Sequence, residues 1–195
     1  MEEYIKNINS NLYCWIKNGK IIFNDEILFE NKDTDFHSFS KSIFKFLEIS
    51  YPKFFKMDSL SKLAFLASEI ILSKLENEDK NKNNLALIFA NHSSCLSTDI
   101  KHKQSIANPY EYFPSPAVFV YTLPNICLGE ISIRHQLHTE SSFFIFDSFP
   151  FHFFEEYSQI LYQTHNATKV LCGWVEVFED DYEAFVYLKE FKKIG

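Results

Sequence analysis

Two apolar stretches decide the fold class: LALIFAN at residues 85–91 and KVLCGWVEVF at residues 169–178. A continuous apolar run of this length is typical of a strand that is buried on both faces. The shorter run SFFIF at residues 142–146 predicts a third strand. Because helical patterns separate the three runs, the sequence predicts an α/β fold, in which these strands form the centre of a mixed sheet layered with helices.

The longest helical pattern lies just upstream of the first strand. In SLSKLAFLASEIILSKLE, apolar residues recur every three or four positions, which predicts a helix over 59–75 with Asp58 as its N-cap. We expect its apolar stripe to pack on the sheet. A second pattern, rich in Phe and Ile, predicts a helix over 36–49 that is ended by Pro52.

Three more helices are expected downstream, over 97–106, 125–137 and 149–163. Short polar residues or proline stand near the start of each, as is typical of a first helical turn. For the helix over 97–106, the expected N-cap is Ser97 or Thr98, and Pro124 is expected in the first turn of the helix over 125–137. For the helix over 149–163, the expected N-cap is Asp147 or Ser148, followed by Pro150 in the first turn.

The connections follow from turn-forming residues. Residues 11–30 form short extended runs broken at the turn dipeptide Asn18-Gly19. The charged, Asn-rich segment 76–84 is expected to be a surface connection. A turn at 179–181 leads into a last strand or helix. Three prolines are expected to mark an ordered loop: Pro109, Pro114 and Pro116.

Composition limits the class of protein. With 195 residues, 46% of them hydrophobic, we expect residues 1–195 to form a single domain. No apolar run is long enough to span a membrane, and the acidic start MEEYIKNINS is not a secretory signal, so a cytoplasmic protein is expected. The net charge of −7 argues against a nucleic-acid binder, which needs a basic patch to neutralise phosphates.

Cofactor and metal sites lack support. Only four glycines occur, without the spacing of a dinucleotide or P-loop motif, so no cofactor is expected. The four cysteines are scattered, which favours reduced thiols over a zinc site, and Cys95 is interpreted as a buried small residue rather than a nucleophile. His135 and His138 lack the nearby ligands that a metal site needs, so no metal is expected.

The stretch PSPAVFVYTLPNICLGEISIRHQL at 114–137 carries a Pro-Ser-Pro, then Thr-Leu-Pro-Asn, then Gly-Glu-Ile. At this spacing it resembles the N-terminal half of β-ketoacyl synthases, the thiolase-fold condensing enzymes of fatty acid and polyketide assembly. The matching family-motif residues are Pro124, Asn125, Gly129 and Glu130.

Other segments extend this resemblance over 54–190 and leave 1–53 as a variable N-terminal portion. They are FFKMDSLSKLAFLASEIIL (54–72), LALIFANHSSCLSTDIKHKQSI (85–106) and VLCGWVEVF (170–178). The chain is similar above all to short, stand-alone ketosynthase-like domains, including some linked to aryl-polyene or flexirubin pigment clusters. The resemblance implies a thiolase-like N-terminal half.

The resemblance also places the family's nucleophile. In these enzymes a cysteine at the start of a helix takes the acyl group from a carrier-protein thioester. The equivalent position here is about Ser148, and no histidine matches the family's two catalytic histidines. The resemblance therefore implies a non-catalytic pseudoenzyme, an accessory or partner subunit in the assembly of a fatty-acyl, polyketide or polyene product, which binds an acyl carrier protein.

An alternative reading makes the chain an enzyme. Ser148 and His152 stand close in sequence, and a small acyl-thioesterase or acyltransferase would use them as nucleophile and base. No GxSxG elbow is present, and the simpler interpretation of Asp147 and Ser148 is helix capping.

Two features indicate a dimer. In the family, the strand equivalent to 142–146 pairs antiparallel with its mate from a second subunit, and the Gly-Glu-Ile helix lies near the interface. We expect a homodimer, or a heterodimer with a ketosynthase, formed through these elements. For Glu130 and Arg134 the alternative is a simple intrahelical ion pair. The expected interface residues are Phe143, Phe144, Phe146, Glu130 and Arg134, and Phe149, Phe151, Phe153 and Phe154 cover the adjoining surface or fill a monomer core.

Overall fold

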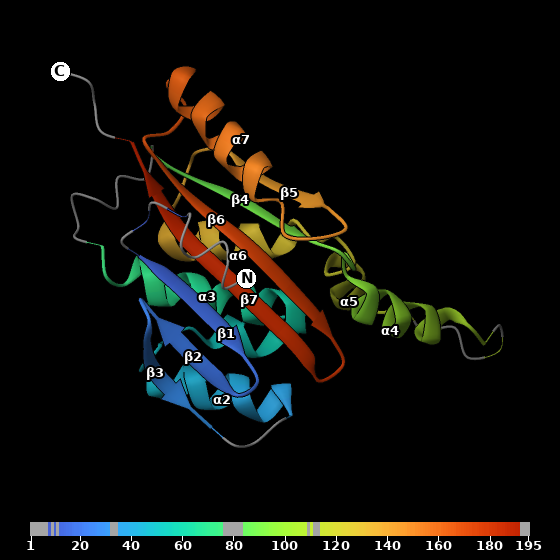
Figure 1. The fold of residues 1–195 in the computed structure, drawn as a ribbon. Helices are drawn as coiled ribbons and strands as arrows, with labels where there is room; N and C mark the ends of the chain where they lie inside the picture. The colour runs from blue at the N-terminus through green and yellow to red at the C-terminus, as the bar shows by residue number, and fades with distance from the viewer. Residues whose placement is uncertain are drawn as a thin grey trace.

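A computed structural model describes residues 8, 10, 12–31, 35–75, 84–108, 110 and 114–191. The described strands form a seven-stranded sheet in the order β3-β2-β1-β7-β6-β4-β5 (Figure 1). The strands are β1 (Tyr13–Lys17), β2 (Lys20–Phe23), β3 (Glu26–Glu30), β4 (Leu85–Asn91), β5 (Ser141–Ile145), β6 (Lys169–Phe178) and β7 (Asp181–Glu190). The helices are α2 (Phe36–Phe46), α3 (Ser59–Leu72), α4 (Leu96–Ile106), α5 (Pro116–Val120), α6 (Ile126–His135) and α7 (Phe151–Gln163), with a short 3₁₀ helix η1 (Pro52–Lys56).

The sheet is mixed, as the sequence predicts. β4 runs parallel to β5 and β6, whereas the other neighbouring pairs are antiparallel. The strands predicted over 85–91, 142–146 and 169–178 are confirmed. The expectation that all three are central is wrong for 142–146, because β5 lies at one edge and pairs with β4 alone among the described strands. The C-terminal segment is a strand, β7, in the middle of the sheet.

Helices cover both faces of the sheet, and the residues of β4 show why this strand is apolar from Leu85 to Ala90. Leu85, Leu87 and Phe89 join the core that also holds residues of α2, α3 and α6. Ala86, Ile88 and Ala90 join the opposite core, which is closed by α7. Figure 1 shows α3 and α6 behind the sheet and α7 in front of it. A strand between two cores cannot alternate between apolar and polar residues.

The helix predicted over 59–75 is confirmed as α3, ending at Leu72. Its N-cap is Asp58, whose carboxylate accepts a hydrogen bond from the backbone N–H of Ser61 at 2.9 Å. The helix packs on the sheet and between α2 and α6, so it is apolar on nearly every side. The turn at Asn18-Gly19 is also confirmed, with both residues at positive φ, of 51° and 73°.

Several predicted helix ends are wrong, because tertiary contacts or proline geometry take the place of the expected cap. α4 begins after Cys95, and the hydroxyls of Ser97 and Thr98 bond to Glu179 and Asp58 instead of capping it. For α7 the N-cap residue is Pro150, so neither Asp147 nor Ser148 caps a helix over 149–163. The capping hydrogen bond expected from Asp147 or Ser148 is therefore absent at the start of α7.

Prolines also act differently from the sequence expectation. Pro52 starts η1, since α2 has already ended at Phe46. Pro116 starts α5 rather than continuing a loop, and Pro124 precedes Asn125, the N-cap residue of α6. Pro109 and most of the segment 76–84 lie outside the described residues.

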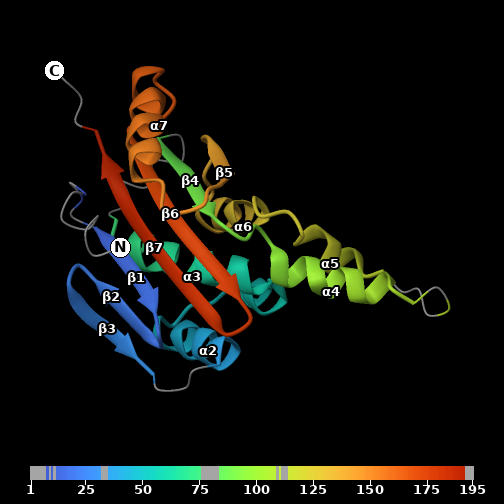
Figure 2. The ribbon, with the colours of Figure 1, turned by 45° about the vertical axis from the view of Figure 1, so that its right-hand side comes forward.

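The remaining helices form an arm. α4 and α5 project away from the sheet (Figures 1 and 2). The first turn of α4 stays attached to the body, because the Thr98 hydroxyl donates to the carboxylate of Asp58 at the start of α3, at 3.0 Å. No helix of the described residues is long and apolar enough to cross a membrane.

Candidate functional site

The main candidate site lies where β5 ends and α7 begins. In α/β sheets, ligands collect at the carboxyl ends of the parallel strands. β4 and β5 end together there, joined by a hydrogen bond from the Phe146 N–H to the Asn91 carbonyl at 2.9 Å. A hollow of about 380 Å³ opens at this edge, and it is lined by Phe146, Asp147, Ser148, Phe149, Pro150, Phe151, His152 and Phe153.

Ser148 and His152 both border the hollow but do not form a catalytic pair. Ser148 is exposed in the loop, and His152 is exposed in the first turn of α7 with its ring centroid 5.4 Å from that of Phe151. Within the described chain neither side chain makes a hydrogen bond with a protein group. The hydroxyl therefore lacks the base and the orienting group that activate a serine nucleophile.

Thiols offer no alternative nucleophile. All four cysteines are buried and none is in a disulfide. Burial raises the pKa of Cys172 to about 12, and burial together with Asp58 and Asp99 raises the pKa of Cys95 to about 12. These thiols stay protonated at neutral pH, so they are poor nucleophiles. Cys95 is a buried small residue, as the sequence interpretation holds.

The phenylalanines around the hollow divide into two groups. Phe149 and Phe154 are buried in the core beneath α7. Phe144, Phe146 and Phe153 are half-buried, and their rings meet at centroid distances of 4.7 Å for Phe144–Phe153 and 4.9 Å for Phe146–Phe153. The aromatic content therefore fills the monomer core and also leaves a partly exposed aromatic surface beside β5.

A turn after β4 is held by polar side chains at the same end of the parallel strands. The Asn91 side chain is fully buried, accepts from the Ser94 N–H at 2.9 Å and donates to the Ser94 carbonyl at 2.8 Å. Glu176 of β6 accepts from the backbone N–H of His92, at 2.8 Å. Sequence reasoning missed both residues. A polar residue at the end of an otherwise apolar run was the signal for Asn91.

The outer edge of β5 is open. The Leu87 N–H donates to Glu140 and the Phe146 N–H donates to Asn91, so the even-numbered residues of this segment direct their backbone groups toward β4. The backbone groups of Ser141, Phe143 and Ile145 therefore face outward. No described strand pairs with this edge. Ile145 is 52% exposed.

The family-motif residues lie on α6 and the turn before it, away from the hollow. Glu130 is 4% exposed; its carboxylate lies 2.9 Å from the Lys53 ammonium and accepts from the Tyr121 hydroxyl at 3.0 Å. Burial, followed by the hydrogen bond to Glu130, raises the pKa of Tyr121. Glu130 therefore fixes α6 to η1 and to the segment before α6.

Arg134 pairs with a different helix. Its guanidinium lies 2.7 Å from the Glu69 carboxylate of α3 and 5.5 Å from the ring centroid of Tyr51. The alternative prediction of an intrahelical ion pair between Glu130 and Arg134 is therefore wrong. His135 also reaches Glu69, at 2.8 Å. Burial acts to raise the pKa of Glu69, but the hydrogen bonds from His135 and Arg134 outweigh it and lower the pKa to about 2.

The partners of these residues were missed at the sequence level. No sequence pattern around Lys53 or Tyr121 predicts that their side chains contact Glu130. Glu69 did carry a signal, because it is the only charged residue in the apolar stretch from Leu63 to Leu72. A charge in a buried helix requires a partner.

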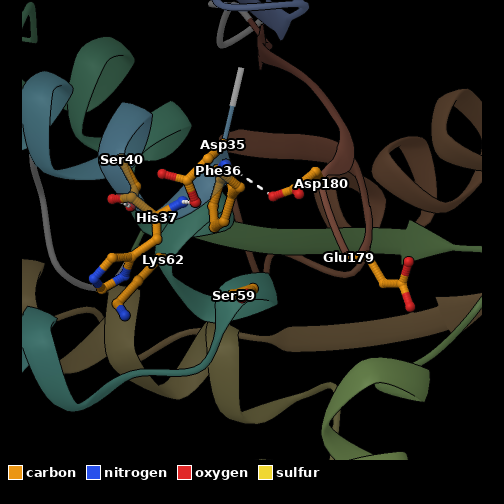
Figure 3. Close-up of a pocket in the computed structure, with 8 residues that line it drawn as sticks. All are labelled: Asp35, Phe36, His37, Ser40, Ser59, Lys62, Glu179 and Asp180. Atoms are coloured by element: carbon orange, nitrogen blue, oxygen red, sulfur yellow. Dashed lines mark hydrogen bonds between the residues drawn. The ribbon is translucent and has the colours of Figure 1, made fainter. Parts of the chain in front are cut away.

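A second, smaller pocket of about 100 Å³ lies between the starts of α2 and α3 and the turn that joins β6 to β7. Figure 3 shows His37 and Lys62 on one side of it and Asp180 near the start of α2. No group of three or more His, Cys, Asp or Glu side chains in the described ranges is placed to hold a metal ion.

No family model matches the sequence, and no curated protein matches it. Solved structures do match. One is a chain of the ketosynthase ApeO in complex with its chain length factor ApeC from Xenorhabdus doucetiae, at a TM-score of 0.62 and 16% identity. The alignment covers 95% of this chain and 80% of that one, so the two chains are similar in length.

Two further structures show the same fold. A chain of the ishigamide ketosynthase/chain length factor matches at a TM-score of 0.64 and 14% identity, over 95% of this chain and 62% of that chain. A chain of AntDE:AntF, a type II PKS acyl-carrier protein in complex with its ketosynthase bound to the hexaketide, matches at 0.61 and 14% identity, over 93% of this chain and 61% of that chain. The predicted thiolase-like fold of ketosynthases is confirmed.

Proposed function

We propose that this chain is a partner subunit of a ketosynthase, of the chain-length-factor kind, and that it does not catalyse the condensation itself. The system it serves assembles a fatty-acyl, polyketide or polyene product on a carrier protein. The observation that carries the proposal is the start of α7. Where the resemblance places a nucleophilic thiol, the chain has an exposed Ser148 without a base, and its thiols are buried elsewhere.

The open edge of β5 supports a role as a subunit. Outward backbone groups of an unpaired edge strand readily pair with another chain. Beside this edge lie the half-buried rings of Phe144, Phe146 and Phe153, which offer apolar area to a partner. Antiparallel pairing with the equivalent strand of a ketosynthase, or of a second copy, joins two sheets into one.

α6 adds a second element to this interface. The side chains of Glu130 and Arg134 have partners within the chain, so they hold the helix in place. The part of α6 that a partner can reach is its outer face, where Ile133 is 61% exposed. We therefore place Ile133 with Ile145 and Phe143 in the proposed interface.

Co-expression with a ketosynthase from the same organism tests the proposal. Ile145→Pro removes one outward N–H and leaves the bonds to β4 intact, whereas Ile145→Ala keeps the N–H and shortens the side chain. Light scattering on the purified proteins should show a dimer for the wild type, a weakened dimer for the alanine variant, and a monomer for the proline variant. A wild-type chain that stays monomeric at high concentration and binds no ketosynthase contradicts the proposal.

An activity assay separates the subunit role from an enzymatic one. The purified chain, incubated with acyl thioesters of the carrier protein and of coenzyme A, should release no free thiol above the buffer rate. Turnover that Ser148→Ala or His152→Ala abolishes would reject the non-catalytic role in favour of a thioesterase or acyltransferase.

A further inference from the structure

The Asn18-Gly19 turn between β1 and β2 carries a reactive dipeptide that the subunit role does not use. Asparagine is a thermolabile residue, and a following glycine has no side chain to hinder attack by its own backbone nitrogen on the carboxamide. Asn18 is exposed and Gly19 is buried, and both have positive φ. The turn therefore combines an accessible carboxamide with a backbone nitrogen that lies inside the protein.

The reaction at such a dipeptide has two steps. The backbone nitrogen of Gly19 attacks Cγ of Asn18, so that a new N–C bond forms. The bond from Cγ to the amide nitrogen breaks, and ammonia leaves with the proton of the Gly19 nitrogen. Water then opens the succinimide ring at either of its two carbonyl groups. The products are aspartate and isoaspartate at position 18, and isoaspartate places an additional methylene in the main chain.

The carboxamide that would be attacked is unrestrained. The Asn18 side chain makes no hydrogen bond with another residue in the described part of the chain, and the residue lies at the surface, where water can reach the ring. Rotation of this side chain toward the backbone nitrogen therefore breaks no contact with those residues. Any protection of the turn in the folded protein must come from Gly19.

The backbone of Gly19 is held on both sides. Its N–H donates to the Tyr182 hydroxyl at 3.0 Å, and its carbonyl accepts from the Asn31 N–H at 2.9 Å. Ring closure requires the Gly19 nitrogen to lose its proton and to turn toward Cγ of Asn18. Both changes require the hydrogen bond to Tyr182 to break first.

Tyr182 is a rigid acceptor for this bond. It is 4% exposed, and its ring centroid lies 5.0 Å from that of Phe36 and 5.3 Å from that of Phe39, so helix α2 holds the ring in place. Burial raises the pKa of Tyr182, so the hydroxyl is neutral at physiological pH. A neutral hydroxyl accepts the N–H of Gly19 without acting as a base that removes its proton.

We propose that Asn18 is a site of spontaneous deamidation and that the Tyr182 hydroxyl suppresses the reaction in the folded protein. Isoaspartate would lengthen the main chain of the turn and disturb the pairing of Lys17 with Lys20. β1 also pairs with β7 in the middle of the sheet, so the damage would lie next to a central strand. The site is separate from the β5 edge and does not depend on the proposed subunit role.

The test is incubation of the purified chain at pH 8, followed by mass spectrometry of the peptide that contains Asn18. The folded wild type should deamidate at least about tenfold more slowly than the same chain in urea, because ring closure requires local opening. Tyr182→Phe keeps the buried ring and removes the acceptor, so this folded variant should react about fivefold faster than the folded wild type.

Tyr13→Phe is the matched control. It removes a buried hydroxyl of the same sheet, which bonds to Asp25 in the next turn at 2.6 Å, and should leave the rate within about twofold of the wild type. Equal acceleration by the two substitutions would show that a loosened sheet exposes the turn, and would overturn the role of Tyr182. So would a rate that Tyr182→Phe leaves unchanged.

Two further measurements need no variant. An unfolded chain that does not deamidate at Asn18 would overturn the site itself. Deuterium exchange of the Gly19 amide in the folded wild type tests the bond to Tyr182 directly, even where Tyr182→Phe fails to fold. Slow exchange, like that of the paired amides of β1, is the expected result, and exchange at the rate of an unfolded peptide would overturn the protection.

Discussion

The guanidinium of Arg134 lies 2.7 Å from the carboxylate of Glu69, and this bond ties α6 to α3 across 65 positions of the chain. Glu69 is 8% exposed, so its charge depends on partners inside the protein. Arg134 is the only arginine in the sequence, and its fork of donors reaches the Ser50 carbonyl as well. A lysine at this position has one point charge and cannot make both contacts with the same geometry.

Arg134→Met should destabilise the fold, because it leaves the Glu69 carboxylate with fewer partners in a buried site. We expect the free energy of unfolding to fall by about 3 kcal/mol, measured by urea denaturation. Lys20→Met is the matched control. It removes an exposed pair with Glu30 and should change the free energy by less than about 1 kcal/mol. Equal effects of the two substitutions would contradict the role given to Arg134.

Stability should fall in acid through Glu69. Its pKa is about 2 in the folded protein, lowered from 4.5, so the folded state holds the carboxylate ionised more strongly than the unfolded state does. The resulting stabilisation is complete above the unfolded pKa and is lost as the pH falls from about 4.5 toward 2. Urea melts over this range should show a steeper decline for the wild type than for Glu69→Gln, which carries no titrating group there. Parallel curves would show that Glu69 titrates normally.

Replacing either of two glycines by alanine should change the free energy of unfolding, in opposite directions for the two positions. A Cβ at Gly173 in β6 would lie 2.7 Å from ring atoms of Phe89, which is fully buried in β4, so the ring must move. Gly173→Ala should lower the free energy of unfolding by about 1–3 kcal/mol. A Cβ at Gly129 in α6 meets no atom within 4 Å, so Gly129→Ala should raise stability by about 0.5–1 kcal/mol. Thermal melts of both variants check the pair.

The four thiols should be protected in the native state. All four are buried, and burial raises the pKa of each one. Ellman's reagent at pH 8 should react with the native protein slowly and with the urea-unfolded protein at once, for four thiols in total. Immediate reaction of one thiol in the native protein would identify an accessible nucleophile and would count against the non-catalytic role.

The sheet and its main helix could be predicted because local pattern and tertiary role coincide there. LALIFAN is apolar from Leu85 to Ala90 because β4 lies between two cores. Asp58 directly precedes α3 and caps it. The edge position of β5 could not be predicted. SFFIF has the composition of a buried strand, because its rings pack against α7 on one face and against the opposite core on the other.

The polar contacts were harder to predict, because they join segments that are distant in sequence. The spacing of Glu130 and Arg134 favours an intrahelical pair, yet Lys53 and Glu69 bind them instead. The hydroxyls of Ser97 and Thr98 likewise form hydrogen bonds with Glu179 and Asp58 instead of capping α4. The position of Ser148 followed from the resemblance, but its lack of a base became visible only in the structure.

The central position of β7 has a consequence for synthesis of the protein. β7 pairs with β1 on one side and with β6 on the other, so Val186 lies opposite both Cys14 and Gly173. Until the ribosome has released residues 181–190, the meander β1–β2–β3 cannot join the parallel strands. The face of the sheet on which the apolar surface of α3 packs is then incomplete. The pairing of β1 with β7 therefore forms only after residues 181–190 are synthesised, and contacts between segments so distant in sequence favour slow folding.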